Sequence, residues 1–413
     1  MGRLKNNLLI DDNVFFVLDA IEKRGYEARV VGGASRDFLL QRKISDVDIA
    51  TSATPTEVIG IFSDLGLKTI PTGVKYGSIT LLYKGKSYEI TTLREDIKTF
   101  GRRAEVKFSK SFEEDSKRRD FTINAIYIDK NGKLYDYHSG IDDVFAGRIR
   151  FIGDARKRIA EDYLRILRYF RFTASHGDYK CDPKYLEIID EMKSGVKILS
   201  TERIVSELLK IFDIPDSYRI IPPMKKVLDE LFSLRVDSLA ATFELGIFKS
   251  LTNVERLSML LKFSNDDSLA RRYDFPRKIK ELLLLKPIEL IPPSPVKFEN
   301  SVKYALKKTP RSLRNFYVKF LAIDAYLNKG FSKADAKNFL EELSNFCKSE
   351  YIDFKLRADD LKEYAPTEEE LKAAMIAAKE FWLDDDATRD ECKKVAVERL
   401  GFLRANSQSD QRS

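Results

Sequence analysis

The spacing of apolar residues changes abruptly near residue 145 of this 413-residue chain. Before that point strand and helix signals alternate, and the turns KGK (84–86) and KNG (130–132) each separate two apolar runs, as in β-hairpins. After it, stretches such as 158–176, 201–212 and 368–383 repeat apolar residues with a helical period. The sequence therefore predicts an α/β head with a mixed sheet, followed by an all-helical remainder.

Four elements can be bounded in the first part of the head. The signals indicate a strand over 26–31, a helix over 34–40, a strand over 46–50 and a helix over 54–66. The second helix follows a threonine suited to an N-cap and ends at a glycine, which are ordinary start and stop signals.

Composition narrows the class of protein. With 43% hydrophobic and 33% charged residues and no apolar run of about 18 residues, neither a membrane-spanning helix nor a membrane partner is expected. Acids within the apolar part of the N-terminus argue against a secretory signal. Cys181, Cys347 and Cys392 lie far apart, which fits neither a disulfide framework nor a zinc site and predicts a reducing compartment, cytoplasmic or mitochondrial. The net charge of +7 favours a polyanionic partner.

Two adjacent glycines, Gly32 and Gly33, stand between the first predicted strand and helix. Glycine lets the backbone approach a ligand closely, and the first amides of the helix point to the same place. Arg36 lies in the first helical turn, where its guanidinium can bind a phosphate, and Asp37 can hold that arginine in place. These four residues are candidate nucleotide contacts, although a glycine pair is also typical of an ordinary turn.

Three carboxylates are candidates for a metal site. Asp46 and Asp48 lie two apart in a predicted strand, so both side chains project from one face and repel each other unless a cation lies between them. Glu89 belongs to a neighbouring predicted strand and is a candidate third carboxylate. Paired Mg²⁺ ions on such a face can activate a hydroxyl and neutralise pyrophosphate. Solvated acids on an exposed strand remain an equal alternative.

A second group of polar residues follows in RRDFTINA (118–125). Arg118 and Arg119 are suited to phosphate, and Asp120 and Asn124 are suited to ribose hydroxyls. This segment precedes an apolar strand, which would hold the four side chains in one place.

A third group lies in the helical pattern of 158–172. On one helix Asp162 and Arg165 are three apart and share a face, and Arg168 continues that stripe. A carboxylate beside an arginine accepts and donates hydrogen bonds in the order that cytosine and adenine share, and in the wrong order for guanine and uracil. The alternative is an intrahelical ion pair that only stabilises the helix.

Together, GGASRDFLL…SDVDIAT, RRDFTINA, EDYLRILRYFRF and TERIVSELLKI closely resemble the class II tRNA nucleotidyltransferases, the CCA-adding enzymes. The match covers roughly residues 20–215. It implies a nucleotidyltransferase head (1–145), a helical neck with the nucleotide-selecting helix (146–215), a helical body (216–300) and a tRNA-binding helical tail (301–413).

The resemblance also implies an activity and its residues. The activity is addition of CCA to the 3′ end of tRNA from CTP and ATP without a nucleic-acid template, with Mg²⁺ as cofactor. The implied catalytic and metal-binding residues are Asp46 and Asp48, with Glu89 as a weaker third. The implied nucleotide contacts are Gly32, Gly33 and Arg36 for triphosphate, Arg119, Asp120 and Asn124 for ribose, and Glu161, Asp162 and Arg165 for the base. Glu202 and Arg203 resemble the motif that supports the selecting helix.

Other functions remain open on the sequence alone. Bacterial poly(A) polymerases share the head motifs, and relatives that add only CC or only A exist within the class. The segment 89–108 resembles the flexible loop of complete CCA enzymes, which favours full CCA addition. Two alternatives come from other classes of protein. A catalytically idle RNA-binding protein would have no need to keep Asp46, Asp48 and Asp162 together. A D-x-D glycosyltransferase that uses a sugar nucleotide would have no need of RRDFTINA. Oligomeric state is left open.

The segment 301–320 contains six basic residues and no acid. Such a segment can follow a tRNA backbone. The candidate RNA contacts are Lys307, Lys308, Arg311 and Arg314. The alternative is a solvated helix face with its apolar residues turned inward.

Overall fold

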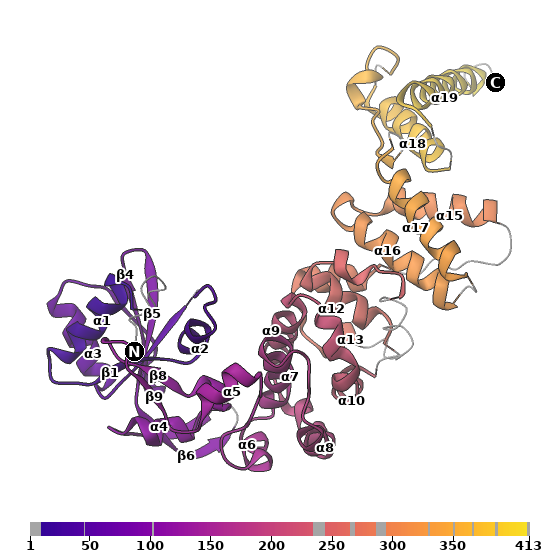
Figure 1. The fold of residues 1–413 in the computed structure, drawn as a ribbon. Helices are drawn as coiled ribbons and strands as arrows, with labels where there is room; N and C mark the ends of the chain where they lie inside the picture. The colour runs from indigo at the N-terminus through magenta and orange to yellow at the C-terminus, as the bar shows by residue number, and fades with distance from the viewer. Residues whose placement is uncertain are drawn as a thin grey trace. The chain divides into compact units, whose positions relative to one another are not determined.

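The computed structural model describes residues 10–410 except 45, 101–102, 234–243, 265–268, 286–294, 329–330, 350–351, 366 and 385–386. The chain divides into two compact units, Met1–Ser233 and Leu234–Ser413. The first unit contains the sheet and the helices up to α10, and the described residues of the second form helices joined by turns (Figure 1).

The first unit is built on a mixed seven-stranded sheet with the order β3-β4-β5-β2-β1-β8-β9. Its strands are β1 (Ala28–Val31), β2 (Val47–Thr51), β3 (Thr69–Gly73), β4 (Ser78–Tyr83), β5 (Lys86–Thr92), β8 (Ile126–Ile128) and β9 (Leu134–Asp136). The pair β2 and β5 is parallel, and the other neighbours are antiparallel. The two predicted hairpins are confirmed as β4–β5 and β8–β9.

Two helices cover one face of this sheet. Residues of α1 (Asp12–Glu22) and α3 (Pro55–Asp64), such as Leu18 and Phe62, share a buried cluster with Val30, Ile49 and Ile90 of the central strands. Thr54 caps α3 and forms a capping box with Glu57, as the sequence indicates. The short helix α2 (Gly33–Leu39) follows β1 directly.

The other face of the sheet is covered differently. Phe112 of α4 (Phe112–Lys117) packs with Val31, Ala50, Leu93 and Tyr127. The segment compared above with a flexible loop forms a separate two-stranded ribbon of β6 (Arg94–Phe100) and β7 (Arg103–Phe108). Two of its residues, 101 and 102, lie outside the described residues.

Helices complete the first unit. They are α5 (Gly140–Ala146), α6 (Ala155–Glu161), α7 (Leu164–His176), α8 (Pro183–Met192), α9 (Thr201–Asp213) and α10 (Ile221–Phe232). Aromatic rings join them to the sheet domain, because Phe121 packs against Phe151, Tyr169 and Phe172. The helix α7 is thereby fixed beside the RRDFTINA segment.

Among the described residues of the second unit, two buried clusters stand out. Its helices are α12 (Asn253–Lys262), α13 (Leu269–Arg272), α14 (Arg277–Leu283), α15 (Pro295–Lys308), α16 (Arg311–Asn328), α17 (Lys333–Phe346), α18 (Glu368–Asp384) and α19 (Arg389–Asp410). One cluster centres on α16, and the other joins α18 to α19 around Trp382. Within the described residues, no helix has the length and apolar character needed to span a membrane.

The predicted fold class, a mixed-sheet head followed by helices, is confirmed. The predicted strand over 46–50 begins one residue later, at Val47, so Asp46 lies just before β2 rather than within it. The division of the chain into head, neck, body and tail stays a prediction.

Candidate active site

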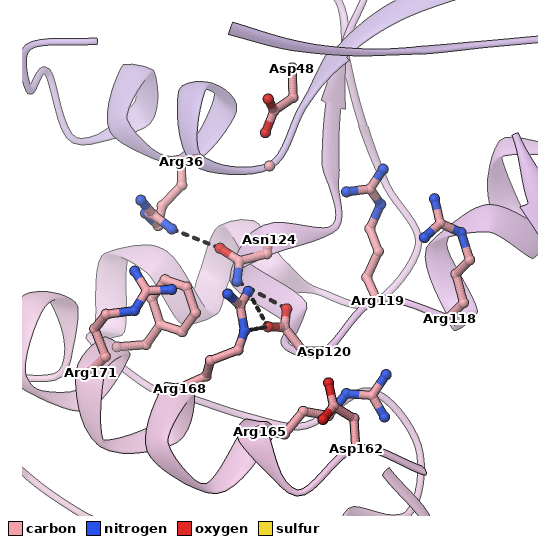
Figure 2. A pocket seen from close by; sticks show the side chains of 13 residues that line it. Arg36, Asp48, Arg118, Arg119, Asp120, Asn124, Asp162, Arg165, Arg168 and Arg171 are labelled. Carbon is pink, nitrogen blue, oxygen red and sulfur yellow. Dashed lines mark hydrogen bonds and ion pairs between the residues drawn. The ribbon is translucent and has the colours of Figure 1, made fainter. Parts of the chain in front are cut away.

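A cavity of about 420 Å³ opens in the first unit where the sheet meets α7 (Figure 2). Six arginines and three aspartates line it, together with two glycines, an asparagine and a phenylalanine. The lining residues are Gly32, Gly33, Arg36, Asp48, Arg118, Arg119, Asp120, Asn124, Asp162, Arg165, Arg168, Arg171 and Phe172. This excess of cations makes the cavity suited to a polyanion.

The glycine turn brings the backbone close to Asp48. Gly32 has φ of 80°, a conformation that favours glycine, and a Cβ built there would lie 3.5 Å from Oδ2 of Asp48. Gly33 begins α2, and a Cβ there would lie 3.5 Å from Nη2 of Arg36. The turn therefore leaves its backbone open to the cavity.

A chain of hydrogen bonds crosses the floor of the cavity (Figure 2). Nη1 of Arg36 donates to Oδ1 of Asn124 at 2.7 Å, and Nδ2 of Asn124 donates to Oδ1 of Asp120 at 3.1 Å. Nε of Arg168 donates to the other oxygen of Asp120 at 2.7 Å. Burial opposes ionisation of Asp120, but Arg168 and the hydrogen bonds outweigh it and lower its pKa to about 2. Asp37 holds Arg36 from outside the cavity, at 3.1 Å from its Nε.

A fully buried acid, Asp115, orients the two arginines of RRDFTINA. Its Oδ1 lies 2.6 Å from Nη2 of Arg118, and its Oδ2 accepts hydrogen bonds from Arg119 at 3.0 Å and from the Tyr127 hydroxyl at 2.8 Å. Burial raises the pKa of Asp115, but Arg119, Arg118 and Tyr127 together lower it to about 2. Both arginines are thus held with their guanidinium groups at the cavity.

Carboxylates gather at the end of the cavity formed by the sheet. Asp48 and Glu89 are register partners on β2 and β5. Although Asp48 is accessible to water, protein atoms surround it in the cavity, and this desolvation, with the charges of Glu89 and Asp46, raises its pKa to about 6 despite Arg119. Mutually repelling oxygen donors of this kind fit a hard divalent cation. Within the part of the chain that the structure describes, no three acidic, histidine or cysteine side chains converge into a metal cluster.

The prediction of a single helix over 158–172 is wrong. The helix α6 ends at Glu161, Asp162 is extended with φ of −156° and ψ of 105°, and α7 begins at Leu164. Asp162 and Arg165 therefore do not share a face of one helix. They nevertheless line the same end of the cavity, opposite Asp48, because the chain changes direction between them (Figure 2).

Asp162 and Arg165 each have another partner. Oδ2 of Asp162 accepts a hydrogen bond from Nη2 of Arg203 on α9 at 2.7 Å. Nη1 of Arg165 donates to Glu161 at 2.6 Å and to the carbonyl of Arg158 at 2.5 Å. Among the described residues these two side chains form no ion pair with each other, so an intrahelical pair does not account for them.

The structure brings most of the predicted site residues together. Four of the predicted catalytic and nucleotide-binding residues do not line the cavity: Asp37, Asp46, Glu89 and Glu161. Asp37 and Glu161 contact lining arginines, and the charges of Asp46 and Glu89 act on Asp48. The roles assigned to all of these residues stay predictions.

Three contributors were missed by the sequence analysis. Arg171 and Phe172 line the cavity, and Arg171 is held by the buried Glu207 and lies 4.2 Å from the Phe172 ring centroid. Asp115 lies beneath the lining. Arg171 follows Arg168 at helical spacing, a signal that could have identified it, but the burial of Asp115 has no sequence signal.

The basic segment of the second unit divides into two kinds of residue. Nζ of Lys307 is buried and donates to the carbonyl of Trp382 at 2.5 Å, and Arg314 is buried and bonds to the carbonyls of Leu306 and Thr309. Lys308 and Arg311 are exposed. Their contact with RNA stays a prediction, and the burial of Lys307 and Arg314 favours a structural role for those two.

Comparisons with known proteins agree with this geometry. The model of the Poly A polymerase head domain matches residues 28–150. Human CCA tRNA nucleotidyltransferase 1, mitochondrial, is 38% identical over 268 residues, covering 59% of this chain and 61% of that protein. The CCA-adding enzyme of Staphylococcus haemolyticus is 44% identical over 197 residues, covering 47% of this chain and 48% of that one. The matched part of the chain thus spans about half to three fifths of these curated relatives.

Solved structures extend the likeness along the chain. The crystal structure of the Bacillus stearothermophilus CCA-adding enzyme in complex with CTP has a TM-score of 0.64 and 25% sequence identity. It covers 95% of this chain and 98% of that one.

The seven-stranded sheet lies within the stretch that matches the Poly A polymerase head domain, and the arginine-lined cavity opens beside it. Along the matched stretches the chain is similar to the CCA-adding enzymes, and residues 28–150 match the Poly A polymerase head domain.

Proposed function

We propose that this protein adds C, C and A in turn to the 3′ end of tRNA, using CTP and ATP and releasing pyrophosphate. The observation that carries this proposal is the composition of one cavity. Arginines suited to a triphosphate lie between an acidic end at Asp48 and a selecting end at Asp162 and Arg165. The names of the similar proteins support the same activity.

The arginines would bind the triphosphate. Arg36 and Arg119 are held by Asp37 and Asp115, so their guanidinium groups are oriented before a ligand arrives. A preorganised guanidinium loses little side-chain entropy on binding, and its planar fork matches phosphate oxygens. Asp120 and Asn124 would contact the ribose from the floor of the cavity.

The acidic end would hold Mg²⁺. Asp46, Asp48 and Glu89 would supply oxygen ligands, and Mg²⁺ commonly takes its remaining ligands from substrate phosphates and water. When bound, such ions lower the pKa of the attacking hydroxyl and neutralise charge on the leaving pyrophosphate. This composition fits the raised pKa of Asp48, because a cation would relieve the repulsion among the carboxylates.

The selecting end would recognise the base. The Arg165 guanidinium donates two hydrogen bonds to described residues, and both come from Nη1. The donors on Nε and Nη2 therefore remain for a ligand. Each oxygen of Asp162 accepts one hydrogen bond, from Arg203 or from the Leu164 amide, and each keeps a second lone pair. A donor beside an acceptor matches the Watson–Crick edges of cytosine and adenine.

The reaction is a displacement at the α-phosphorus. The tRNA 3′ oxygen forms a bond to that phosphorus, the hydroxyl proton is released, and the bond to the β-phosphate oxygen breaks. The arginines stabilise the charge of the departing pyrophosphate. No nucleic-acid template is needed, because protein side chains select the base.

A reducing compartment, the cytoplasm or the mitochondrial matrix, is part of the proposal. The number and wide spacing of Cys181, Cys347 and Cys392 in the sequence support it.

The test is an extension assay on tRNA that ends at the discriminator base. The purified protein is incubated with each nucleotide alone and with CTP and ATP together, and the 3′ ends are sequenced. Ordered CCA supports the proposal, whereas a long A tract would identify a poly(A) polymerase. Products ending at CC would identify a partial enzyme, and binding without extension would identify an RNA-binding protein.

A further inference from the structure

The break between α6 and α7 rests against a distant part of the first unit. Tyr163, the residue after Asp162, lies with its ring against Gly195 in the 3-10 helix η3 (Lys193–Ile198). A Cβ added at Gly195 would lie 1.9, 2.1 and 2.3 Å from Cε1, Cδ1 and Cζ of that ring. The ring therefore occupies the space that any larger residue at position 195 would need.

The backbone does not require glycine at this position. Among the glycines that the structure describes, Gly195 is not one with positive φ. Alanine has a higher helix propensity than glycine, so the helical backbone alone would favour alanine at position 195. The close approach of the Tyr163 ring is therefore the physical reason for glycine here. The element η3 packs against α7, α8 and α10 and buries Val196. These contacts hold Gly195, and with it the surface on which the Tyr163 ring packs, in a fixed position.

The position of Tyr163 determines the direction of its neighbours. Asp162 is extended, and Tyr163 is already helical, with φ of −62° and ψ of −15°. The amide of Arg165 donates to the carbonyl of Asp162 at 3.0 Å, and the amide of Ile166 donates to the carbonyl of Tyr163 at 3.1 Å. Displacement of the ring would therefore turn the start of α7 and both cavity side chains with it.

We propose that Tyr163 and Gly195 form a positioning pair that sets Asp162 and Arg165 for nucleotide selection. This inference rests on the proposed function and deepens it. Tyr163 and Gly195 do not line the cavity, so they act through the two residues that do. They are positioning residues, because they touch neither the substrate site nor the reacting atoms.

The test compares Gly195→Ala, Tyr163→Ala and the double variant with wild type. The measured quantity is the ratio of kcat/KM for CTP to that for UTP on one tRNA. Gly60→Ala is the matched control, because Gly60 lies in the helix α3 and a Cβ there meets nothing within 4 Å.

Each single variant is expected to lower the CTP-to-UTP ratio by about tenfold, the size of effect given by one well-placed polar contact. The double variant is expected to be no worse than Tyr163→Ala alone, because without the ring the added methyl group has nothing to displace. Such non-additivity is the signature of two residues in direct contact. Gly60→Ala is expected to leave the ratio unchanged.

An unchanged ratio in Tyr163→Ala, or additive losses in the double variant, would overturn the inference. Tyr163→Ala and the control carry the test even if Gly195→Ala does not fold. A wild-type protein that adds no CCA would instead refute the proposed function. Affinities for CTP and UTP, measured by calorimetry on the same variants without tRNA, then decide the inference separately.

Discussion

Asp48 and Glu89 are register partners on the parallel strands β2 and β5, so their carboxylates project from the same face of the sheet. Neighbouring strands lie about 4.8 Å apart, which places the two acids within ligating distance of one cation. Their mutual repulsion is one cause of the raised pKa of Asp48. The proposed metal site would thus be a property of strand pairing rather than of one motif.

Replacing Asp48 by alanine is expected to abolish incorporation of both CTP and ATP. Loss of a metal ligand removes several kcal/mol of transition-state stabilisation, and ~4 kcal/mol corresponds to about a thousandfold in rate. Asp46→Ala is expected to behave alike, while tRNA affinity changes little in both. Single-turnover extension and filter binding measure the two effects.

The matched control is Asp213→Asn, an exposed acid at the end of α9. It is expected to leave turnover unchanged. Turnover near the wild-type rate in either Asp46→Ala or Asp48→Ala would remove the metal assignment.

The buried Asp115 predicts a pH-dependent stability. Its pKa is about 2 in the folded protein, against 3.8 for an ordinary aspartate, so its ionised form stabilises the fold above pH 3.8. That contribution, ~2 kcal/mol, is lost as the pH falls from 3.8 through 2. Calorimetry is expected to show that Asp115→Asn lowers Tm at pH 7 and that the difference from wild type shrinks below pH 4.

Asp213→Asn serves as the control for this experiment too, because it removes an exposed carboxylate. Its Tm is expected to follow that of wild type at every pH. A difference between wild type and Asp115→Asn that stays constant from pH 7 to pH 2.5 would show that the ion pairs of Asp115 do not stabilise the fold.

The β6–β7 ribbon provides a third prediction. Asp96 and Val106 are register partners, so residues 97–105 can be replaced by an Asn-Gly turn that keeps the base of the ribbon. If the ribbon helps the cavity change from a pyrimidine to a purine, the shortened protein adds CC and then stalls. ATP incorporation into tRNA ending in CC is expected to fall about tenfold or more, equivalent to ~1.4 kcal/mol.

Addition of CTP to the shorter tRNA is the internal control, and its rate is expected to be preserved. Completion of CCA at the wild-type rate would exclude a role for the ribbon in the change from C to A.

Local signals predicted much of the head. The turn between β4 and β5 has positive φ at Lys84 and Gly85, as tight hairpins require, and the threonine before α3 caps it. These features depend on neighbouring residues, which a sequence displays directly. The predicted cluster of cavity residues followed from the same short motifs.

Features that depend on distant contacts were not predictable in this way. The helical spacing of apolar residues in 158–172 continues through Asp162, so the sequence shows no break there. The break between α6 and α7 is held by the hydrogen bond from Arg203 to Asp162 and by the packing of the Tyr163 ring on Gly195. Likewise, the sequence predicts that Lys307 is exposed, but in the structure Lys307 is buried and donates a hydrogen bond to the carbonyl of Trp382. Spacing shows which residues share an element, but it does not show which elements meet.

The central claim is that Arg165 and Asp162 select the nucleotide, and Arg165→Ala tests it most directly. The measurement is kcat/KM for all four nucleotides on one tRNA, with Arg156→Ala, an exposed arginine of α6, as the control. A bidentate contact to a base gives about 1–3 kcal/mol of discrimination, so the CTP-to-UTP ratio is expected to fall about tenfold or more in Arg165→Ala alone. An unchanged ratio, with all four nucleotides slowed alike, would contradict the account and leave Arg165 as a structural partner of Glu161.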